Sequence, residues 1–342
     1  MPKVGISLWG GMTASNVVEC VKFAERRGFS SAWMAEGHGW DAFSILTACA
    51  RSTKKIKLGT SIVSVFVRSA PTIALGAATV DAISEGRFIL GLGSSHRVQV
   101  EPEHGLTYQK PMQRVRETVE IVRSLLRNGK ISYKGNIYPQ VDYDLWFTPV
   151  RKEVPIYLAA VFPKMLELCG QIAQGALMVW NTVGWTRQAA QILKSAAEKS
   201  GRKPSDVELA SLVATSISED AEAAIRGMRQ LVAFYAGFFP RYNRLISESG
   251  FAKEAKEIRE AWLGGRKEEA SSIVTEKMTK ELSIVGGPEE CVKRLREYRR
   301  AGLTLPILFP TAPPKKPGKA SGYHGLATVK DAVIAAIKAA SP

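Results

Sequence analysis

Apolar runs and amphipathic stretches alternate along almost the whole chain. Runs rich in branched apolar residues are typical of buried strands, and segments with apolar residues at helical spacing lie between them. Eight runs have the strand pattern: residues 4–8, 31–35, 56–65, 88–92, 154–160, 176–180, 207–214 and 303–309. Helices are predicted between them at 14–27, 41–51, 72–82, 110–126, 164–174, 186–200 and 329–340. Strands that alternate with helices in this way predict an α/β fold with a parallel sheet.

Eight strands with intervening helices favour a (β/α)8 TIM barrel, and a doubly wound open sheet is the alternative. We expect one domain over residues 1–342. Residues 219–283 are helical in pattern and rich in charge, and they are far too long for an ordinary crossover, so they predict a helical insertion between strands seven and eight. An extended excursion or hairpin is expected at 135–150. A mobile loop is expected at 311–321, where Pro, Lys and Gly are concentrated.

The unit from Leu58 to Ser95 forms a complete strand, helix and strand. Its second strand ends in Gly93, Ser94 and Ser95. Barrels and open α/β sheets both bind their ligands at the carboxyl ends of the strands. Small residues at that end allow a ligand to approach the backbone closely. The sequence therefore predicts a ligand site around residues 93–95.

Composition narrows the class of partner. The 342 residues suit one barrel of about 250 residues with insertions. The net charge of +15 is dispersed, with no basic helix that carries interleaved aromatic residues. Nucleic acid is therefore not expected as a partner, whereas an anionic cofactor or small-molecule substrate is. Without a run of about 18 apolar residues, no membrane partner is expected either.

Cysteine usage and the first residues bear on the compartment. The four cysteines form no CxxC pair and stand mostly in helical contexts, so we interpret them as reduced core residues. No metal site is expected, because the acidic residues and histidines at 101–104 match no ligand spacing. The first ten residues enter a strand without the layout of a signal peptide. These observations predict a cytoplasmic protein.

Several motifs together resemble the luciferase-like flavin and deazaflavin oxidoreductases. They are residues 58–95, the pattern P-x-x-x-x-R-E at 111–117, residues 154–160 with 163–165, and 302–304. The pattern is most similar to the branch that uses coenzyme F420, such as methylenetetrahydromethanopterin reductase, and covers about residues 1–214 and 284–342. This resemblance implies a (β/α)8 barrel that transfers a hydride between the deazaflavin C5 and an organic substrate, which is methylenetetrahydromethanopterin-like in the nearest relatives.

The resemblance also implies where coenzyme F420 would bind. A non-proline cis peptide at Ser61–Ile62 would back the ring, near Gly93, Ser94 and Ser95. The phosphate end would lie on backbone amides after strands five and six, where a helix N-terminus suits an anion. The residues concerned are Ala160, Val161, Phe162, Pro163, Lys164, Asn181 and Thr182. Simple helix capping is the alternative interpretation of these last positions.

Candidate catalytic residues follow strands two and four. Relatives carry an acidic residue and a histidine near Glu36 and His38, although here Gly37 separates the two. His96 stands where related deazaflavin enzymes often place an acidic residue. Imidazole titrates near neutrality, so either histidine can act as an acid or base. The alternative is that both histidines only satisfy backbone groups at the rim of the barrel.

Other possibilities stay open at this level. FMN is the alternative cofactor, and an FMN-dependent monooxygenase of the same fold is the alternative enzyme. A non-enzymatic cofactor-binding relative is the third hypothesis. Family members commonly form dimers, so a homodimer is expected. Trp9, Trp40 and Trp180 would either line a pocket or pack in the core, and Arg87 is expected to pair with Asp81.

Overall fold

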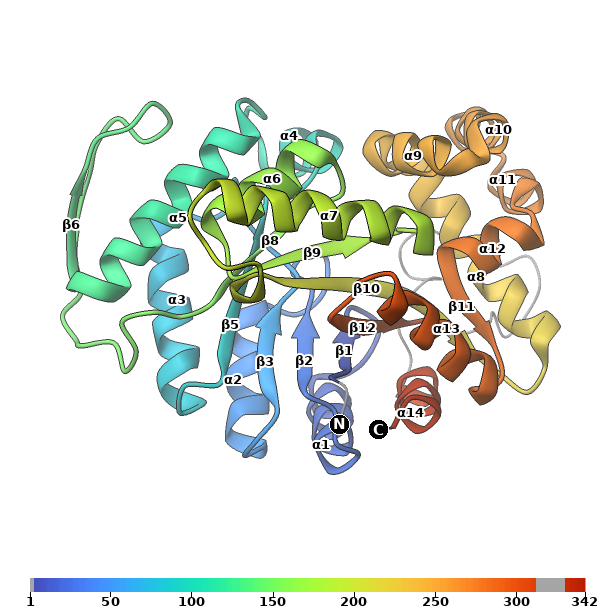
Figure 1. Cartoon of the computed structure of the whole chain (residues 1–342), viewed down its shortest axis with the longest axis horizontal. Coiled ribbons are helices and arrows are strands. Elements are labelled where there is room, and N and C mark those ends of the chain that lie inside the picture. The colour runs from blue at the N-terminus through green and yellow to red at the C-terminus, as the bar shows by residue number, and fades with distance from the viewer. Residues whose placement is uncertain (1–2, 312–329, 342) are drawn as a thin grey trace.

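The barrel is closed by eight parallel strands in the described part of the chain. The computed structural model describes residues 3–311 and 330–341. Each barrel strand pairs with two neighbours, and the last strand returns to the first, which confirms the TIM barrel over an open sheet (Figure 1). In order around the barrel the strands are β1 (Gly5–Leu8), β2 (Ser31–Met34), β3 (Lys57–Thr60), β5 (Phe88–Gly93), β8 (Ile156–Ala159), β9 (Gly175–Val179), β10 (Glu208–Ile217) and β12 (Leu305–Pro310).

Helices cover the outside of the barrel, and seven of the eight lie where the amphipathic pattern predicts a helix. They are α1 (Ala14–Arg26), α2 (Ala42–Ser52), α3 (Ala70–Ile83), α5 (Pro111–Asn128), α6 (Pro163–Ile172), α7 (Val183–Lys199), α13 (Pro288–Arg300) and α14 (Lys330–Ala339). Local chemistry sets their ends: the Thr13 hydroxyl accepts a hydrogen bond from the Asn16 amide at the start of α1, and α5 ends at Gly129 with φ of 74°. α14 lies beside α1, which brings the two ends of the chain together (Figure 1).

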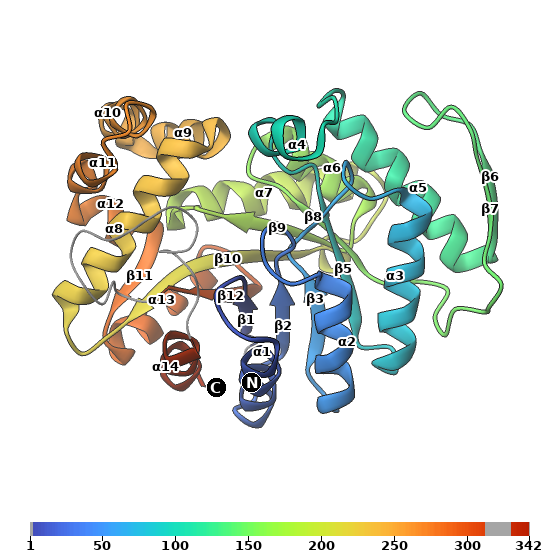
Figure 2. The ribbon, with the colours of Figure 1, turned by 180° about the vertical axis from the view of Figure 1, so that it is seen from behind.

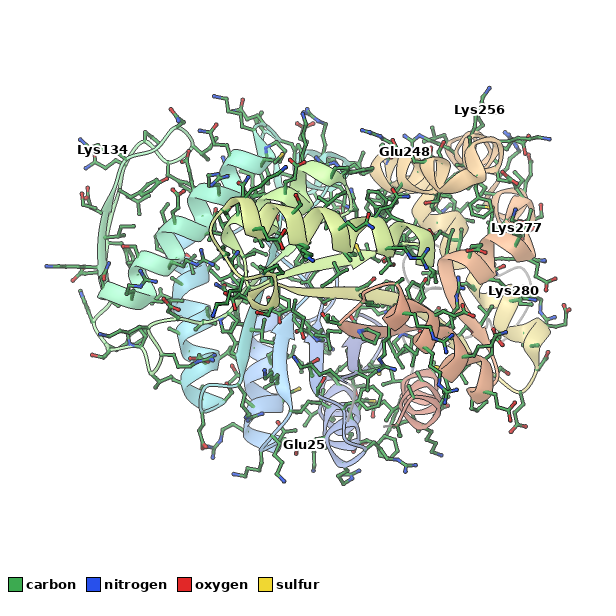
Figure 3. The ribbon with its side chains drawn as sticks, viewed as in Figure 1. Glu25, Lys134, Glu248, Lys256, Lys277 and Lys280 are labelled. Carbon is green, nitrogen blue, oxygen red and sulfur yellow. The ribbon has the colours of Figure 1, made fainter. Side chains whose placement is uncertain are left out.

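A two-stranded hairpin stands apart from the barrel. It comprises β6 (Lys130–Tyr133) and β7 (Val141–Asp144), antiparallel to each other and packed against α5 (Figures 1 and 2). Lys134 follows β6 at its outer end (Figure 3). The hairpin begins five residues earlier than the expected 135–150. Buried Glu117 of α5 explains this, because its carboxylate accepts hydrogen bonds from the amides of residues 136–138 and fixes the loop rather than the strands there.

The residues between β10 and β12 form a helical layer on one side of the barrel mouth (Figure 1). The helices are α8 (Ala221–Phe238), α9 (Pro240–Ile246), α10 (Ala252–Leu263), α11 (Lys267–Ile273) and α12 (Glu276–Leu282). A further strand, β11 (Ser283–Gly286), follows them and pairs with residues 214–217 of β10. The sequence pattern misses β11 and ends the seventh strand at 214. The pairing with β11 extends β10 to Ile217.

Several other expectations are corrected. The helix α4 (Arg97–His104) was not expected, and neither was α13. Asp81 pairs with Arg151 instead of Arg87, whose guanidinium donates to the backbone carbonyls of residues 50, 53, 56 and 84. The expected loop at 311–321 lies outside the described residues apart from its first residue. All four cysteines are buried and unbonded, and their burial raises the thiol pKa values.

Two aromatic side chains fill the lower part of the barrel, which is the part away from the carboxyl ends of the strands. Trp33 and Tyr157 lie with their ring centroids 5.6 Å apart, and Ile89, Leu177, Ala210, Leu305 and Ile307 complete this inner cluster. Each polar tip has a partner: the indole Nε1 of Trp33 donates to Ser31, and the Tyr157 hydroxyl donates to Glu208. The barrel is therefore closed below, and ligands have access only from the carboxyl ends of its strands.

Glycines on neighbouring strands make room for these rings. A Cβ at Gly59 would lie 2.3 Å from the Trp33 ring, and one at Gly175 would lie 2.5 Å from the Tyr157 ring. Both distances are far below van der Waals contact. Because the rings are buried and held by hydrogen bonds, neither can move aside easily. No helix among the described residues has the length and apolar character to span a membrane.

Gly59→Ala is therefore expected to destabilise the protein. Overpacking of a closely packed core typically costs about 1–3 kcal/mol, and here the added methyl group would contact a ring. Chemical denaturation should show a loss of unfolding free energy in that range. Gly184→Ala is the matched control, because its Cβ would meet its nearest neighbour at an ordinary 3.8 Å. Equal stability of the two variants would contradict the packing argument.

Candidate active site

A cavity of about 1730 Å³ lies at the carboxyl ends of the barrel strands. Typical small-molecule sites have volumes of about 300–1,000 Å³, so this cavity has room for a cofactor and a substrate together. The loops after β1, β2, β3, β5 and β8 line it, and residues of α8 and α9 form one wall. Twelve of the residues that the sequence predicts line this cavity: Glu36, His38, Ser61, Ile62, Ser94, Ser95, His96, Ala160, Val161, Phe162, Pro163 and Lys164.

The floor of the cavity lies between β3 and the short strand β4 (Val63–Ser64). The peptide bond Ser61–Ile62 is cis, as the resemblance implies. Ile62 lies against Gly93, where an added Cβ would be 2.8 Å from the Ile62 side chain. Gly93 is thus behind the floor and does not line the cavity. The hydroxyl oxygen of Ser61 is buried without a hydrogen-bond partner in the described residues.

Asn181 and Thr182 do not line the cavity. The Asn181 amide donates to the Thr186 hydroxyl over 2.6 Å, and its oxygen accepts from Ser211. The Thr182 hydroxyl accepts from the Trp185 amide at the start of α7. These side chains are committed to internal hydrogen bonds. The geometry at this position is therefore that of helix capping, the alternative that the sequence left open.

The segment 160–164 enters the cavity just before α6. Phe162 is the N-cap residue of α6 but caps it with no side-chain hydrogen bond, and Pro163 occupies the first turn. The helix therefore presents amides that no side chain satisfies. Lys164 lines the cavity beside them. Among the described residues, no carboxylate lies within ion-pair distance of its amine. This end of the cavity suits an anion.

Glu36 and His38 lie on the opposite rim, and each has a charged or titratable partner. The guanidinium of Arg68 binds the Glu36 carboxylate at 2.6–3.2 Å and also contacts Asp41. The hydrogen bond to Glu36 raises the pKa of Arg68 further. The imidazole Nε2 of His38 lies 3.1 Å from a carboxylate oxygen of Glu103 in α4. Glu36 is thus held in place by Arg68, and the imidazole of His38 is held by Glu103.

His96 occupies an aromatic cage. Its ring lies 4.6 Å from the Phe239 ring and 4.8 Å from the Tyr242 ring, measured between centroids. Burial, reinforced by the positive charge of Arg241, lowers the pKa of His96 to about 3. Its Nδ1 atom is buried and has no hydrogen-bond partner among the described residues. In the free protein His96 is therefore a neutral polar group at pH 7, which does not fit the acid or base role that the sequence suggests.

Sequence reasoning missed the wall formed by α8 and α9. This wall comprises Tyr235, Phe239, Pro240, Arg241, Tyr242 and Arg244. Arg241 donates to the Ser94 hydroxyl at 3.2 Å. Arg244 lies over the Phe162 ring and donates to Glu248, which is labelled in Figure 3. The signal that could have found this wall is the density of aromatic residues at 234–242, within an otherwise charge-rich insertion.

Of the three tryptophans that were expected either to line a pocket or to pack in the core, one lines the cavity. Trp9 lines the cavity, and its indole nitrogen is buried without a partner in the described part of the chain. Trp40 is about half exposed, and Trp180 is buried against Tyr235; neither lines the cavity.

Comparison with known proteins shows the family of the chain. Residues 3–305 match the family described as luciferase-like monooxygenase. The chain belongs to this family. It is 29% identical over 321 residues to the 5,10-methylenetetrahydromethanopterin reductase of Archaeoglobus fulgidus, spanning 92% of this chain and 95% of that protein. The resemblance drawn from residues 58–95 and the other motifs is thereby confirmed.

Two solved structures share the fold. The coenzyme F420-dependent tetrahydromethanopterin reductase of Methanopyrus kandleri superposes with a TM-score of 0.84 at 24% identity, covering 99% of this chain and 98% of that one. An F420-dependent secondary alcohol dehydrogenase, solved in complex with an F420–acetone adduct, has a TM-score of 0.74 at 22% identity, covering 90% and 93%. Both likenesses support the barrel of the luciferase-like family for this chain.

The buried imidazole of His96 predicts a pH dependence of stability. Its pKa is depressed in the folded state, so the unfolded chain binds the proton more readily and stability is lost as the pH falls below 6.5. At pH 5, about 1.5 pKa units below the unfolded value, the cost is about 2 kcal/mol. Denaturant titrations at pH 8 and pH 5 should show this loss in the wild type and a smaller loss in His96→Gln.

His104→Gln is the control for this prediction, because His104 is an exposed residue at the end of α4. Its pH profile should follow the wild type. A His96→Gln profile that also follows the wild type would show that the imidazole is not protected from protonation.

Proposed function

We propose that this protein is a coenzyme F420-dependent oxidoreductase that transfers a hydride between the deazaflavin C5 and an organic substrate. The observation that carries the proposal is the cavity at the barrel mouth, with an uncharged floor of small and aliphatic side chains and an anion-suited end at α6. A tricyclic ring with an anionic tail has this same division into a flat apolar part and a charged part. The relative from Archaeoglobus fulgidus, named as a methylenetetrahydromethanopterin reductase, supports the assignment.

Unpartnered polar atoms test whether such a ring fits. Ser61, Trp9 and His96 line the cavity, and each has a buried polar atom without a partner among the described residues. Buried polar groups in folded proteins nearly always have hydrogen-bond partners, supplied by protein, water or ligand. The pyrimidine edge of a deazaflavin carries both donors and acceptors. The residues present therefore fit the group.

The other end of the cavity fits the cofactor's tail. Coenzyme F420 carries a phosphodiester and carboxylates, which require cations or backbone amides. The uncapped amides of α6, with Lys164 and Arg244 beside them, would hold the phosphate. Arg244 already donates to Glu248, so Lys164 is the cation with its charge free for this purpose.

The chain's own groups divide the remaining tasks. When bound, the cofactor supplies the carbon that accepts or donates the hydride. We assign the movement of the substrate proton to the imidazole of His38, because His38 lines the cavity and its contact with Glu103 holds the ring in place. Glu36, fixed by Arg68, places a negative charge beside His38. His96 would orient bound groups through a neutral hydrogen bond, and the aromatic wall of α8 and α9 would exclude water.

The finer assignments are part of this proposal. We take a methylenetetrahydromethanopterin-like compound as the first substrate to test, and a secondary alcohol as the second, because the names of the relatives point to these two. FMN-dependent monooxygenation remains the alternative activity, in keeping with the name of the family. A homodimer and a cytoplasmic location stay predictions.

Cofactor choice is the first experiment. Fluorescence titration of the purified protein should give a Kd for coenzyme F420 at least tenfold lower than that for FMN, a difference of about 1.4 kcal/mol. The reason is that the motifs at 58–95 are most similar to the branch of the family that uses coenzyme F420, and a relative named as an F420-dependent oxidoreductase supports this choice. A reversed order would favour the monooxygenase, and binding of neither cofactor would favour the non-enzymatic relative.

The second experiment concerns the proton. With coenzyme F420 and an accepted substrate, His38→Ala should lower turnover by roughly 100-fold, within the usual range for a general acid or base. Cofactor affinity should change little, because the floor and the α6 end are intact. His96→Gln keeps a neutral hydrogen-bonding group and should retain much of the turnover. If instead His96→Gln is the more damaging substitution, His96 and not His38 moves the proton.

A further inference from the structure

A second, smaller cavity opens beside the active site. Its volume is about 390 Å³, and it shares His96, Pro111, Pro240 and Arg241 with the main cavity. The remaining lining is provided by Arg97, Val98, Tyr108, Gln109 and Lys110. The two cavities therefore adjoin one another at these four residues. The smaller cavity is called the side pocket below.

The charge of the side pocket is one-sided. Arg97, Lys110 and Arg241 line it, and no acidic residue does. Arg97 is paired with Glu101, four residues along α4, so its charge is largely compensated. Among the described residues, by contrast, no carboxylate lies within ion-pair distance of Lys110 or Arg241. The guanidinium of Arg241 donates to the Ser94 hydroxyl and lies over the ring of Tyr108, 5.3 Å from its centroid.

Two helices begin at this pocket, and neither is capped. His96 is the N-cap residue of α4 and Lys110 that of α5, and neither side chain makes a capping hydrogen bond. No side chain therefore satisfies the first amides at the positive ends of these two helix dipoles, which are those of residues 97 and 98 in α4 and, because Pro111 has no N–H, those of residues 112 and 113 in α5. Such amides bind anions readily. Lys110 adopts a left-handed backbone, φ 47°, at the turn that starts α5.

An independent observation points to a ligand here. The imidazole of His96 lines both cavities, and its buried Nδ1 atom has no partner among the described residues. Its aromatic neighbours, Phe239 and Tyr242, cannot supply one through their ring faces. A ligand that spans the two adjoining cavities would lie against the His96 imidazole.

We propose that the side pocket binds an anionic group of the substrate, a phosphate or a carboxylate, with Arg241, Lys110 and the first amides of α4 and α5. This inference rests on the proposed function, because it assigns the main cavity to the cofactor ring and the reacting part of the substrate. The cofactor's own phosphate has a separate place at α6, where Lys164 and Arg244 line the main cavity only. Arg241 is thus a specificity-determining residue for substrates with an anionic end.

Inorganic phosphate is the probe for this pocket. We expect isothermal titration at constant ionic strength to show that protein saturated with coenzyme F420 binds phosphate, because the cofactor would occupy the α6 end and leave the side pocket open. The double variant Arg241→Gln with Lys110→Gln should bind phosphate at least tenfold more weakly. Lys253→Gln, which removes an exposed charge on α10 outside both cavities, should bind it like the wild type.

Two further readings separate the possible sources of the anion. The affinity for coenzyme F420 should be unchanged in the double variant, within twofold. If that affinity falls tenfold while the affinity for the tailless deazaflavin riboside is kept, the pocket holds the cofactor's tail and the proposal is wrong. Unchanged phosphate binding in the double variant would overturn it too. Phosphate binding to the free protein is measured in parallel, so a failure to bind F420 counts against the proposed function alone.

Discussion

The packing of Trp33 and Tyr157 inside the barrel is the constraint on which the site depends. Eight parallel strands enclose an interior that must be filled, and here two rings fill its lower part. They fit only because Gly59 and Gly175 leave the space that a Cβ would take. With the lower barrel closed, the carboxyl ends of the strands are the part that stays open. The cavity floor at Ser61–Ile62 is built directly on this layer.

A separate apolar cluster also shapes the active-site cavity. Helices α8 to α12 pack around their own core, which includes Phe234, Phe239, Leu231 and Ile258. This cluster packs α8 and α9 in place beside the barrel. The aromatic and cationic side chains of these two helices therefore form a fixed wall at the mouth. His96 belongs to the barrel but takes its environment from Phe239, Tyr242 and Arg241. The low pKa of His96 therefore arises because the helical layer packs against the mouth of the barrel.

This origin explains what the sequence could and could not predict. The strands and the unit at 58–95 are local patterns, so their place and the likeness to the luciferase-like family were readable. The surroundings of His96 depend on residues about 145 positions away, and no local pattern reports them. The sequence left two interpretations of Thr182 open for another reason: a short polar residue after a strand has the same sequence signature whether it caps a helix or binds a phosphate. Arg151, not Arg87, reaches Asp81 because the return of the chain after the hairpin brings it there.

The distribution of charge separates function from surface. Much of the charge cancels at the surface, where many basic side chains pair with acids three or four residues away, as in Lys280 with Glu276 and Arg266 with Glu269. Exposed pairs of this kind contribute little to stability and give no long-range field. At the barrel mouth the balance differs: Lys164, Lys110 and Arg241 have no carboxylate within ion-pair distance among the described residues. All three side chains line the cavities, so their charges are available to an anion bound there. Positive charge that no nearby carboxylate compensates therefore stands at two places around the mouth, one at α6 and one at α4 and α5.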